Sequence, residues 1–176
     1  ENYAGLQLSN GANVILENGA AESETIGSLT ATGGAAGAGI GSGIFDSAGD
    51  ITISGGTVTA TGGSCQAGIG SGDNGTVGDI TISGGTVTAK SNSEGAGIGT
   101  GRNGTTGDIT ISGGTVTATG GNGAAGIGSG NSSGIGSSKV ETITISGGTV
   151  TATGGDYGVG IGTGSEGTVG NITITG

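Results

Sequence analysis

The chain has 176 residues, with 49 glycines and no proline, histidine, methionine or tryptophan, and its 13 acidic and 3 basic residues give a net charge of −10. This balance argues against nucleic acid and against an anionic membrane surface as partners, because both require clustered lysine and arginine, and no apolar run approaches the length needed for membrane insertion. A collagen-like fold is excluded because glycine does not fall at every third position. The glycines instead recur at fixed places with isoleucine and valine between them, and this pattern predicts an ordered repeat.

Residues 1–34 are the least regular part of the chain. Residues 3–17, YAGLQLSNGANVILE, have the outline of a degenerate first coil, and residues 28–34, SLTATGG, are a divergent copy of a later segment, TVTATGG. Atypical end units are expected in repeat proteins, because the end of a stack must protect its open strand edges. We therefore expect residues 1–34 to form a cap. The start at Glu1, within the pattern, is expected of a mature chain or of an excised piece of a longer one.

Residues 35–176 repeat with a period of 29. The isoleucines that open ITIS or ITIT stand at 51, 80, 109, 143 and 172, and those of the AGIG-type segments stand at 40, 69, 98, 127 and 161. Each series contains one step of 34 among steps of 29, so both meet the same five-residue insertion, near residues 131–139. One structural unit is therefore stacked about five times, with a partial unit at each end.

Within each unit the apolar residues alternate with polar residues or glycine, which predicts short β-strands. The alternation breaks at Gly55-Gly56, where glycine suits a corner because it adopts positive φ without a steric cost. Three short strands per 29-residue coil predict an all-β fold, a right-handed parallel β-solenoid (β-helix) of about six coils spaced by about 4.8 Å. The predicted interior ladders contain Ile51, Ile53, Val58, Ala60, Ala67 and Ile69 with their counterparts, together with Val77 and Val169.

The second strand of each coil places threonines on the outside. They predict a regular grid, with about 4.8 Å between coils and about 6.6 Å along each strand. In one interpretation the threonines supply strand propensity and solubility, with hydroxyls bonded to one another along each ladder; in the other, the grid is a flat binding face. The residues of this candidate face are Thr30, Thr32, Thr57, Thr59, Thr61, Thr86, Thr88, Thr115, Thr117, Thr119, Thr149, Thr151 and Thr153.

The third strand presents only glycine on its outer side, at 39, 41, 43, 68, 70, 72 and equivalent positions. Either the coils leave no room there for side chains, or bare backbone forms a surface for lateral packing. The chain stops at NITITG, after the first strand of a new coil, which favours a truncated piece or an end-to-end contact that continues the stack.

Asp50, Asp79 and Asp108 occupy the same corner position in successive coils. They are expected to cap the corners by hydrogen bonding, and the alternative is a calcium site, since hard cations take oxygen ligands. No cofactor is otherwise predicted. Without histidine no Ser-His-Asp or Cys-His arrangement exists, so we expect no enzyme. Cys65 is not a repeat feature and is interpreted as a tolerated corner residue.

The unit GDITISGGTVTATGG…AGIGSG…GTVGD resembles the glycine- and threonine-rich β-helix repeats of surface or secreted proteins from Gram-positive, mainly clostridial, bacteria, some of them labelled carbohydrate-binding. The resemblance covers residues 3–176 and implies a right-handed β-helix outside the cell. Calcium-dependent carbohydrate binders of this kind carry aspartate-rich strands where this chain has AGIGSG, so their sites are not carried over. TVTATGG also resembles, more weakly, the threonine rows of insect antifreeze β-solenoids, which organise ice-like water.

The resulting functional expectation is an extracellular or cell-surface structural and adhesive module without enzymatic activity. Its expected partner is a surface polymer or glycan, with lateral or end-to-end self-association as a further possibility. The alternative is an ice-binding protein that uses the threonine grid, and the third option is a calcium-dependent polysaccharide binder that uses the aspartate ladder.

Overall fold

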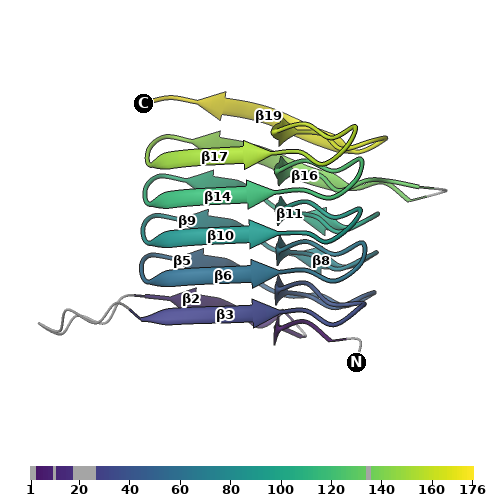
Figure 1. Ribbon diagram of the computed structural model, residues 1–176, viewed down its shortest axis with the longest axis horizontal. Helices are drawn as coiled ribbons and strands as arrows, with labels where there is room; N and C mark the ends of the chain where they lie inside the picture. Colours follow the sequence, from purple (N-terminus) through teal and green to yellow (C-terminus); the bar gives the residue numbers. More distant parts are fainter. Residues whose placement is uncertain (1–2, 10, 18–26, 134–135) are drawn as a thin grey trace, which may run out of the picture.

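A computed structural model describes residues 3–9, 11–17, 27–133 and 136–176, and this part of the chain contains only strands, turns and loops. All strand pairs are parallel and join one coil to the next, so the prediction of a parallel β-solenoid is confirmed. Figure 1 shows the coils stacked from the N-terminus at the bottom to the C-terminus at the top. Within the described ranges no helix is long and apolar enough to span a membrane.

The first sheet, here called the threonine sheet, has five strands of five residues. Its register is unbroken: Thr57 pairs with Ser28 and Thr86, and Thr115 pairs with Thr86 and Thr149. The strands are β3 (Ser28–Thr32), β6 (Thr57–Thr61), β10 (Thr86–Lys90), β14 (Thr115–Thr119) and β17 (Thr149–Thr153).

The second sheet, here called the isoleucine sheet, contains the ITI segments and a further short strand that precedes them. Counting that short strand, a coil has four strands rather than the three that the sequence predicts. The main strands are β2 (Val14–Leu16), β5 (Ile51–Ile53), β9 (Ile80–Ile82), β13 (Ile109–Ile111), β16 (Lys139–Ile145) and β19 (Thr168–Ile174), and the short ones are β8 (Thr76–Val77) and β12 (Thr105–Thr106).

The third sheet, here called the glycine sheet, has strands of two residues each. They are β1 (Leu6–Gln7), β4 (Ile40–Gly41), β7 (Ile69–Gly70), β11 (Ile98–Gly99), β15 (Ile127–Gly128) and β18 (Ile161–Gly162).

The core is a set of stacked apolar ladders between the three sheets. Ile51, Ile53 and Ile69 are fully buried, and Val58 and Ala60 are nearly so. Each coil contributes only a few such residues, so the stack, and not a single coil, provides the core. At one position of the ladder that contains Val77 and Val140, the buried residue is Thr106, whose hydroxyl donates to the Gly99 carbonyl at 3.0 Å.

A positive-φ glycine forms the corner between the isoleucine and threonine strands in each regular coil. Gly56, Gly85, Gly114 and Gly148 have φ between 78° and 86°. This conformation is unfavourable for residues with a Cβ atom, which explains why the second glycine of SGG is invariant among the four ISGGTVTA segments.

Of the two interpretations of the glycine strand, the first is confirmed: the coils leave no room there for side chains, and the strand does not form an exposed bare-backbone face. Gly39, Gly68 and Gly97 are buried, and a Cβ atom at Gly68 or Gly97 would collide with the backbone nitrogen of Lys90 or Thr119, at the end of a threonine strand. These glycines therefore allow two walls of the solenoid to meet with backbone in contact. The absence of side chains at this position is a packing requirement and provides no surface for lateral association.

The insertion lies between β15 and β16. Pairing resumes at once after it, because Lys139 of β16 pairs with Thr105 and Ile143 with Ile109. The base of the loop is closed by hydrogen bonds from Ser138 to Ser132, Asn131 and Gly101. The predicted cap, residues 1–34, contributes β1, β2 and β3, and residues 1–2, 10 and 18–26 of it lie outside the described part.

Candidate binding face

The threonine sheet brings all thirteen predicted threonines together on one face. The strand register places them in three ladders across five coils. All their side chains point outward, because the alternate residues of the same strands, Val58, Ala60, Val87 and Ala89 among them, lie in the core. The ladders are Ser28-Thr57-Thr86-Thr115-Thr149, Thr30-Thr59-Thr88-Thr117-Thr151 and Thr32-Thr61-Lys90-Thr119-Thr153.

The strands of this sheet stack with little twist from coil to coil, as the arrows of β3, β6, β10, β14 and β17 show in Figure 1. Untwisted sheets of several strands are unusual and are stabilised by stacking or by side-chain ladders. Equivalent threonines in neighbouring coils are separated by about 4.8 Å, which is too far for a hydrogen bond between their hydroxyls.

Accordingly, within the described part of the chain, no hydrogen bond joins the hydroxyls of the thirteen threonines, whereas those of Thr76, Thr106, Thr142 and Thr168 elsewhere do bond to other groups. The expectation that hydroxyls bond along each ladder is therefore wrong. Each hydroxyl on this face keeps its donor and its acceptors for water or for a ligand.

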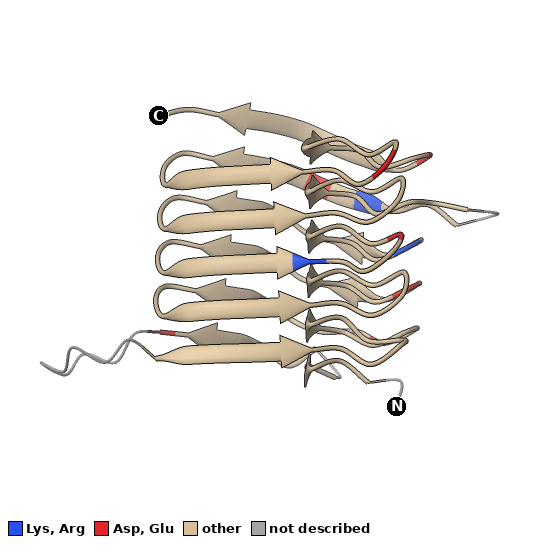
Figure 2. Ribbon diagram, viewed as in Figure 1, with Lys and Arg blue, Asp and Glu red and all other residues tan. Residues whose placement is uncertain are grey.

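The face is nearly uncharged although the protein carries a net charge of −10. Lys90 is the single charged residue among its fifteen ladder positions, and none is acidic. Figure 2 shows the threonine sheet in tan apart from blue at the end of β10, with much of the red in the loops to the right of the strands, beyond their arrowheads. The acidic residues thus lie on other surfaces.

The isoleucine sheet carries a second, narrower ladder of threonines. Thr52, Thr81, Thr110 and Thr144 are paired in register and only partly exposed. Next to them runs the aspartate ladder, so this face differs from the threonine sheet in charge as well as in exposure.

The aspartate ladder acts as a chain of corner caps. The backbone N–H of Asp79 donates to Asp50 Oδ1 and that of Asp108 donates to Asp79 Oδ1, both at 2.9 Å. The ladder begins at Asn13, whose Oδ1 accepts from Asp50 N–H, and ends at Thr142, whose hydroxyl donates to Asp108 Oδ1. Among the described residues no group of three or more acids or cysteines is placed to hold a metal ion, so calcium binding here stays an untested expectation.

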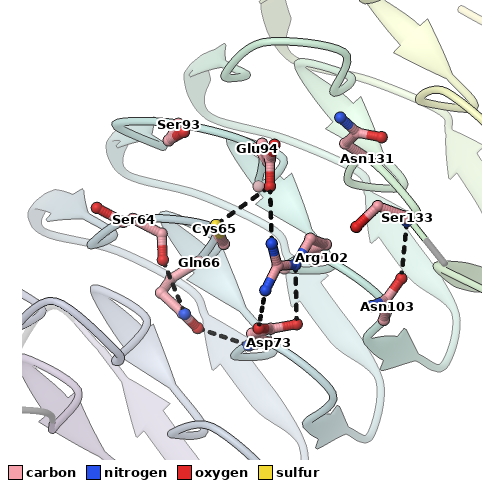
Figure 3. Close-up of polar contacts among 12 residues, drawn as sticks. Ser64, Cys65, Gln66, Asp73, Ser93, Glu94, Arg102, Asn103, Asn131 and Ser133 are labelled. Atoms are coloured by element: carbon pink, nitrogen blue, oxygen red, sulfur yellow. Dashed lines mark hydrogen bonds and ion pairs between the residues drawn. The ribbon is translucent and has the colours of Figure 1, made fainter. Parts of the chain in front are cut away.

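A polar cluster that the sequence analysis missed surrounds Arg102 (Figure 3). Its guanidinium donates to both carboxylate oxygens of Asp73, at 2.7 and 3.4 Å, and to Glu94 at 3.3 Å. The Cys65 thiol donates to the same Glu94 oxygen at 3.2 Å, and the Asp73 backbone N–H donates to Gln66 Oε1 at 2.6 Å.

The environment of this cluster shifts two pKa values. The paired hydrogen bonds to Asp73 raise the pKa of Arg102, so its charge is permanent. Burial, followed by the hydrogen bond to Glu94 and the charge of Glu94, raises the pKa of the Cys65 thiol to about 11. A protonated thiol is a poor nucleophile, and the cluster is therefore a structural clamp.

The sequence contains a signal for this cluster in the spacing of its residues. Asp73 and Arg102 are separated by 29 residues, and so are Cys65 and Glu94. Residues one period apart face each other across neighbouring coils, so opposite charges at that spacing predict an ion pair.

These features define a parallel β-solenoid built from structural repeats, with one uncharged, hydroxyl-bearing face. Residues 51–73, 80–102, 109–131 and 143–165 match the model of a family described as "Beta helix repeat". With 23 residues in each match, these segments cover 92 of the 176 residues, so the chain belongs to this β-helix repeat family. Comparisons with curated proteins and with solved structures give no match.

Proposed function

We propose that the chain is a non-enzymatic structural and adhesive module of a bacterial surface or secreted protein, and that its threonine sheet binds a neutral surface glycan outside the cell. The observation that carries this proposal is the concentration of unbonded threonine hydroxyls on one uncharged face of an acidic protein. The resemblance of the repeats to those of clostridial-type surface proteins supports the location.

The chemistry of the face fits an extended polysaccharide. A row of hydroxyls spaced by about 4.8 Å along the stack can donate to and accept from the hydroxyls of sugar rings. The threonine methyl groups supply apolar contacts between these rows. Since each coil adds one more row, affinity is expected to rise with the number of coils engaged.

The test is co-sedimentation of the whole chain with insoluble cellulose, chitin and peptidoglycan. Thr117→Tyr places a bulky ring in the middle ladder and is expected to abolish retention. Thr110→Tyr, which places the same ring on the isoleucine sheet, is the matched control and is expected to bind like the wild type. Equal retention of both variants, or no retention of the wild type on any of the three polymers, would contradict the proposal.

A second candidate, ice binding, is favoured by the low twist of the same sheet and by its regular register. A flat array of hydroxyl and methyl groups can order water into a fixed lattice. Ice-crystal imaging with measurement of thermal hysteresis distinguishes the two. Shaped crystals and a freezing gap that Thr117→Tyr removes would establish ice as the ligand, whereas unshaped crystals leave glycan binding as the function to pursue.

A further inference from the structure

Two of the three aromatic residues of the chain lie together at the N-terminal end of the solenoid. Tyr3 is 67% exposed and Phe45 is 77% exposed, and both border a hollow of about 460 Å³. The other lining residues are Gln7, Gly43, Ile44 and Asp46, which come from β1 and from the loop that follows β4. This hollow, here called the aromatic hollow, includes no residue of the threonine sheet.

Phe45 occupies a conformation that suits a different residue. Its φ is 55°, and the residues at the same corner of the next two coils, Asn74 and Asn103, have φ of 52° and 54°. Asparagine tolerates this left-handed region, while a bulky side chain adopts it only at an energetic cost. Burial does not offset the cost at Phe45, because the ring is exposed. A strained, exposed aromatic residue where the repeat itself uses asparagine points to a role in binding.

A fixed polar group, the Asp46 carboxylate, also lines the hollow. Asp46 Oδ2 accepts from Gln7 Nε2 at 3.0 Å and from the Ser9 hydroxyl at 2.9 Å, and its Oδ1 accepts from the Ser47 backbone N–H at 2.8 Å. Burial raises the pKa of Asp46, but these hydrogen bonds outweigh burial and lower the pKa below its ordinary value. The carboxylate is thus ionised at neutral pH and held in one orientation beside the rings.

The floor of the hollow is open because it lies in the first coils of the stack. A Cβ atom at Gly43 would lie 3.7 Å from Gln7 Nε2, an ordinary contact, whereas one at Gly72, Gly101 or Gly164 would collide with the backbone of a neighbouring coil. Later coils therefore cannot form this hollow.

We propose that the aromatic hollow is a binding subsite for a neutral pyranose ring. One face of a pyranose presents C–H groups that pack on a flat aromatic ring, and its edge carries hydroxyls that donate to the Asp46 carboxylate and to the Gln7 side-chain oxygen. The two Nε2 hydrogens of Gln7 are already donated to Asp46 and Ser9. Small sites that combine apolar walls with a few fixed polar groups are typical of small-molecule recognition. Uronic acids and other anionic sugars are excluded by Asp46 and by the net charge of −10. This inference goes beyond the proposed function, because it concerns a different surface and does not require the threonine sheet to bind.

The test is titration of the ¹⁵N-labelled whole chain with cellohexaose, laminarihexaose and maltohexaose, followed by NMR. The chain has two glutamines, Gln7 in the hollow and Gln66, which is 2% exposed in the Arg102 cluster. At least one neutral hexaose is expected to shift the Gln7 side-chain amide and leave that of Gln66 unchanged. Trigalacturonic acid is expected to shift neither of them.

Phe45→Asn is the decisive variant, because it installs the residue of the next two coils and preserves the corner. It is expected to fold like the wild type and to weaken binding at least roughly tenfold, which corresponds to the size of one aromatic contact. Tyr157→Asn is the matched control: Tyr157 is 91% exposed at a φ of 61° but lies outside the hollow, and its loss is expected to change nothing.

Two results would overturn this inference: absence of a Gln7 shift with every neutral hexaose, or equal affinity of the Phe45→Asn variant and the wild type. Thr117→Tyr is expected to leave the Gln7 shifts intact. If the threonine sheet fails to bind polymers, sugar binding by the aromatic hollow is therefore unaffected. If the hollow fails to bind a hexaose, polymer binding by the threonine sheet is likewise unaffected.

Discussion

At the scale of single residues, the solenoid is stabilised by interactions between positions one period apart. The Arg102 clamp shows this clearly, because Asp73 is 4% exposed and depends on Arg102, one coil further on, for its charge partner. Outside the clamp, the described residues include an ion pair between Lys139 and Glu141, whose side chains are about half exposed. The two pairs are therefore expected to differ in their contribution to stability.

Replacing Arg102 with alanine leaves the Asp73 carboxylate buried beside an empty space. We expect the free energy of unfolding to fall by roughly 1–3 kcal/mol, since a buried acceptor loses its charged donor. Lys139→Ala, which removes an exposed pair, is expected to cost less than about 0.5 kcal/mol. Urea denaturation followed by far-ultraviolet circular dichroism measures the free energy of unfolding of both variants. Equal losses would show that the Arg102 clamp stabilises the fold no more than the exposed Lys139–Glu141 pair.

The raised pKa of Cys65 predicts low reactivity. With a pKa of about 11 instead of 9.0, alkylation by iodoacetamide at pH 8 is expected to be roughly a hundredfold slower than for an unperturbed cysteine. Because the pKa is higher in the folded than in the unfolded chain, the thiol contributes stability below about pH 9, and this contribution is lost as the pH rises through about 11. Glu94→Ala removes two causes of the shift and should accelerate alkylation; an unchanged rate would exclude the Cys65–Glu94 contact.

The sequence alone predicted the threonine positions correctly because strand alternation and period determine them. It did not predict the Arg102 clamp, because the number of basic residues says nothing of their partners and Cys65, which is not a repeat feature, is interpreted as a tolerated corner residue. Only the comparison of residues 29 positions apart reveals the partners. The hollow beside Phe45 is not predicted for another reason: it depends on the irregular first coil, where the Gln7 side chain, and not the backbone of a regular coil, lies next to Gly43, and no repeat pattern encodes this.

At the scale of strands and corners, the glycine strand is the element for which the sequence left two interpretations open. Alternation identifies the two sides of a strand but does not tell whether the outer side meets water or a second wall. At Gly68 and Gly97 it meets the end of a threonine strand. The outer glycine positions, which the sequence pattern makes look like exposed backbone, are among the most tightly packed.

Two glycines with the same backbone conformation allow the cost of backbone strain to be distinguished from the cost of a steric collision. Gly99 has φ of 133° and an added Cβ atom would collide with the Gly128 carbonyl, while Gly162 has φ of 132° and its nearest neighbours are side-chain atoms at 3.5 Å or more. Gly162→Ala is expected to cost about 1–2 kcal/mol through strain alone, and Gly99→Ala about 4 kcal/mol or more. Thermal denaturation checks this order, and similar melting temperatures for the two variants would contradict the collision.

The aspartate ladder makes a second prediction at this scale. Asp79→Ala removes the acceptor of the Asp108 N–H and is expected to cost about 1 kcal/mol. Asp79→Asn keeps an oxygen at the same place and relieves repulsion between stacked carboxylates, so it is expected to be neutral or slightly stabilising. The melting temperature in calcium and in EDTA should be the same for the wild type. A rise of several degrees in calcium that Asp79→Asn abolishes would instead establish a cation site.

At the scale of the whole molecule, the two ends of the stack are unequal. Within the described chain, the first and last strands of the threonine and glycine sheets have a neighbour on one side only at both ends of the stack. At the N-terminal end Leu6 and Leu16 are partly buried, whereas in β19 at the C-terminal end Ile172 is 44% exposed and Ile174 is 62% exposed. In a stack whose coils stabilise one another through shared interfaces, the coil with one neighbour is the weakest.

Amide hydrogen exchange measured by mass spectrometry should report this gradient. Protection is expected to be highest in β9 and β13, whose isoleucines are fully buried, and lowest in β17–β19. If protection of β17–β19 rises with protein concentration, then a second molecule covers this end. Uniform protection along the stack at every concentration would contradict the gradient.

The insertion between β15 and β16 has a consequence for how such chains change over generations. Five extra residues enter at a corner, and Thr115 still pairs with Thr149 across it. Mutations that lengthen a corner are thus nearly silent for the faces, whereas those that lengthen a strand would shift every later side chain by one position. Duplication of one repeat unit in the gene adds one complete row of outward hydroxyls. The corner that carries the insertion can therefore vary in length while selection acts on the number of rows.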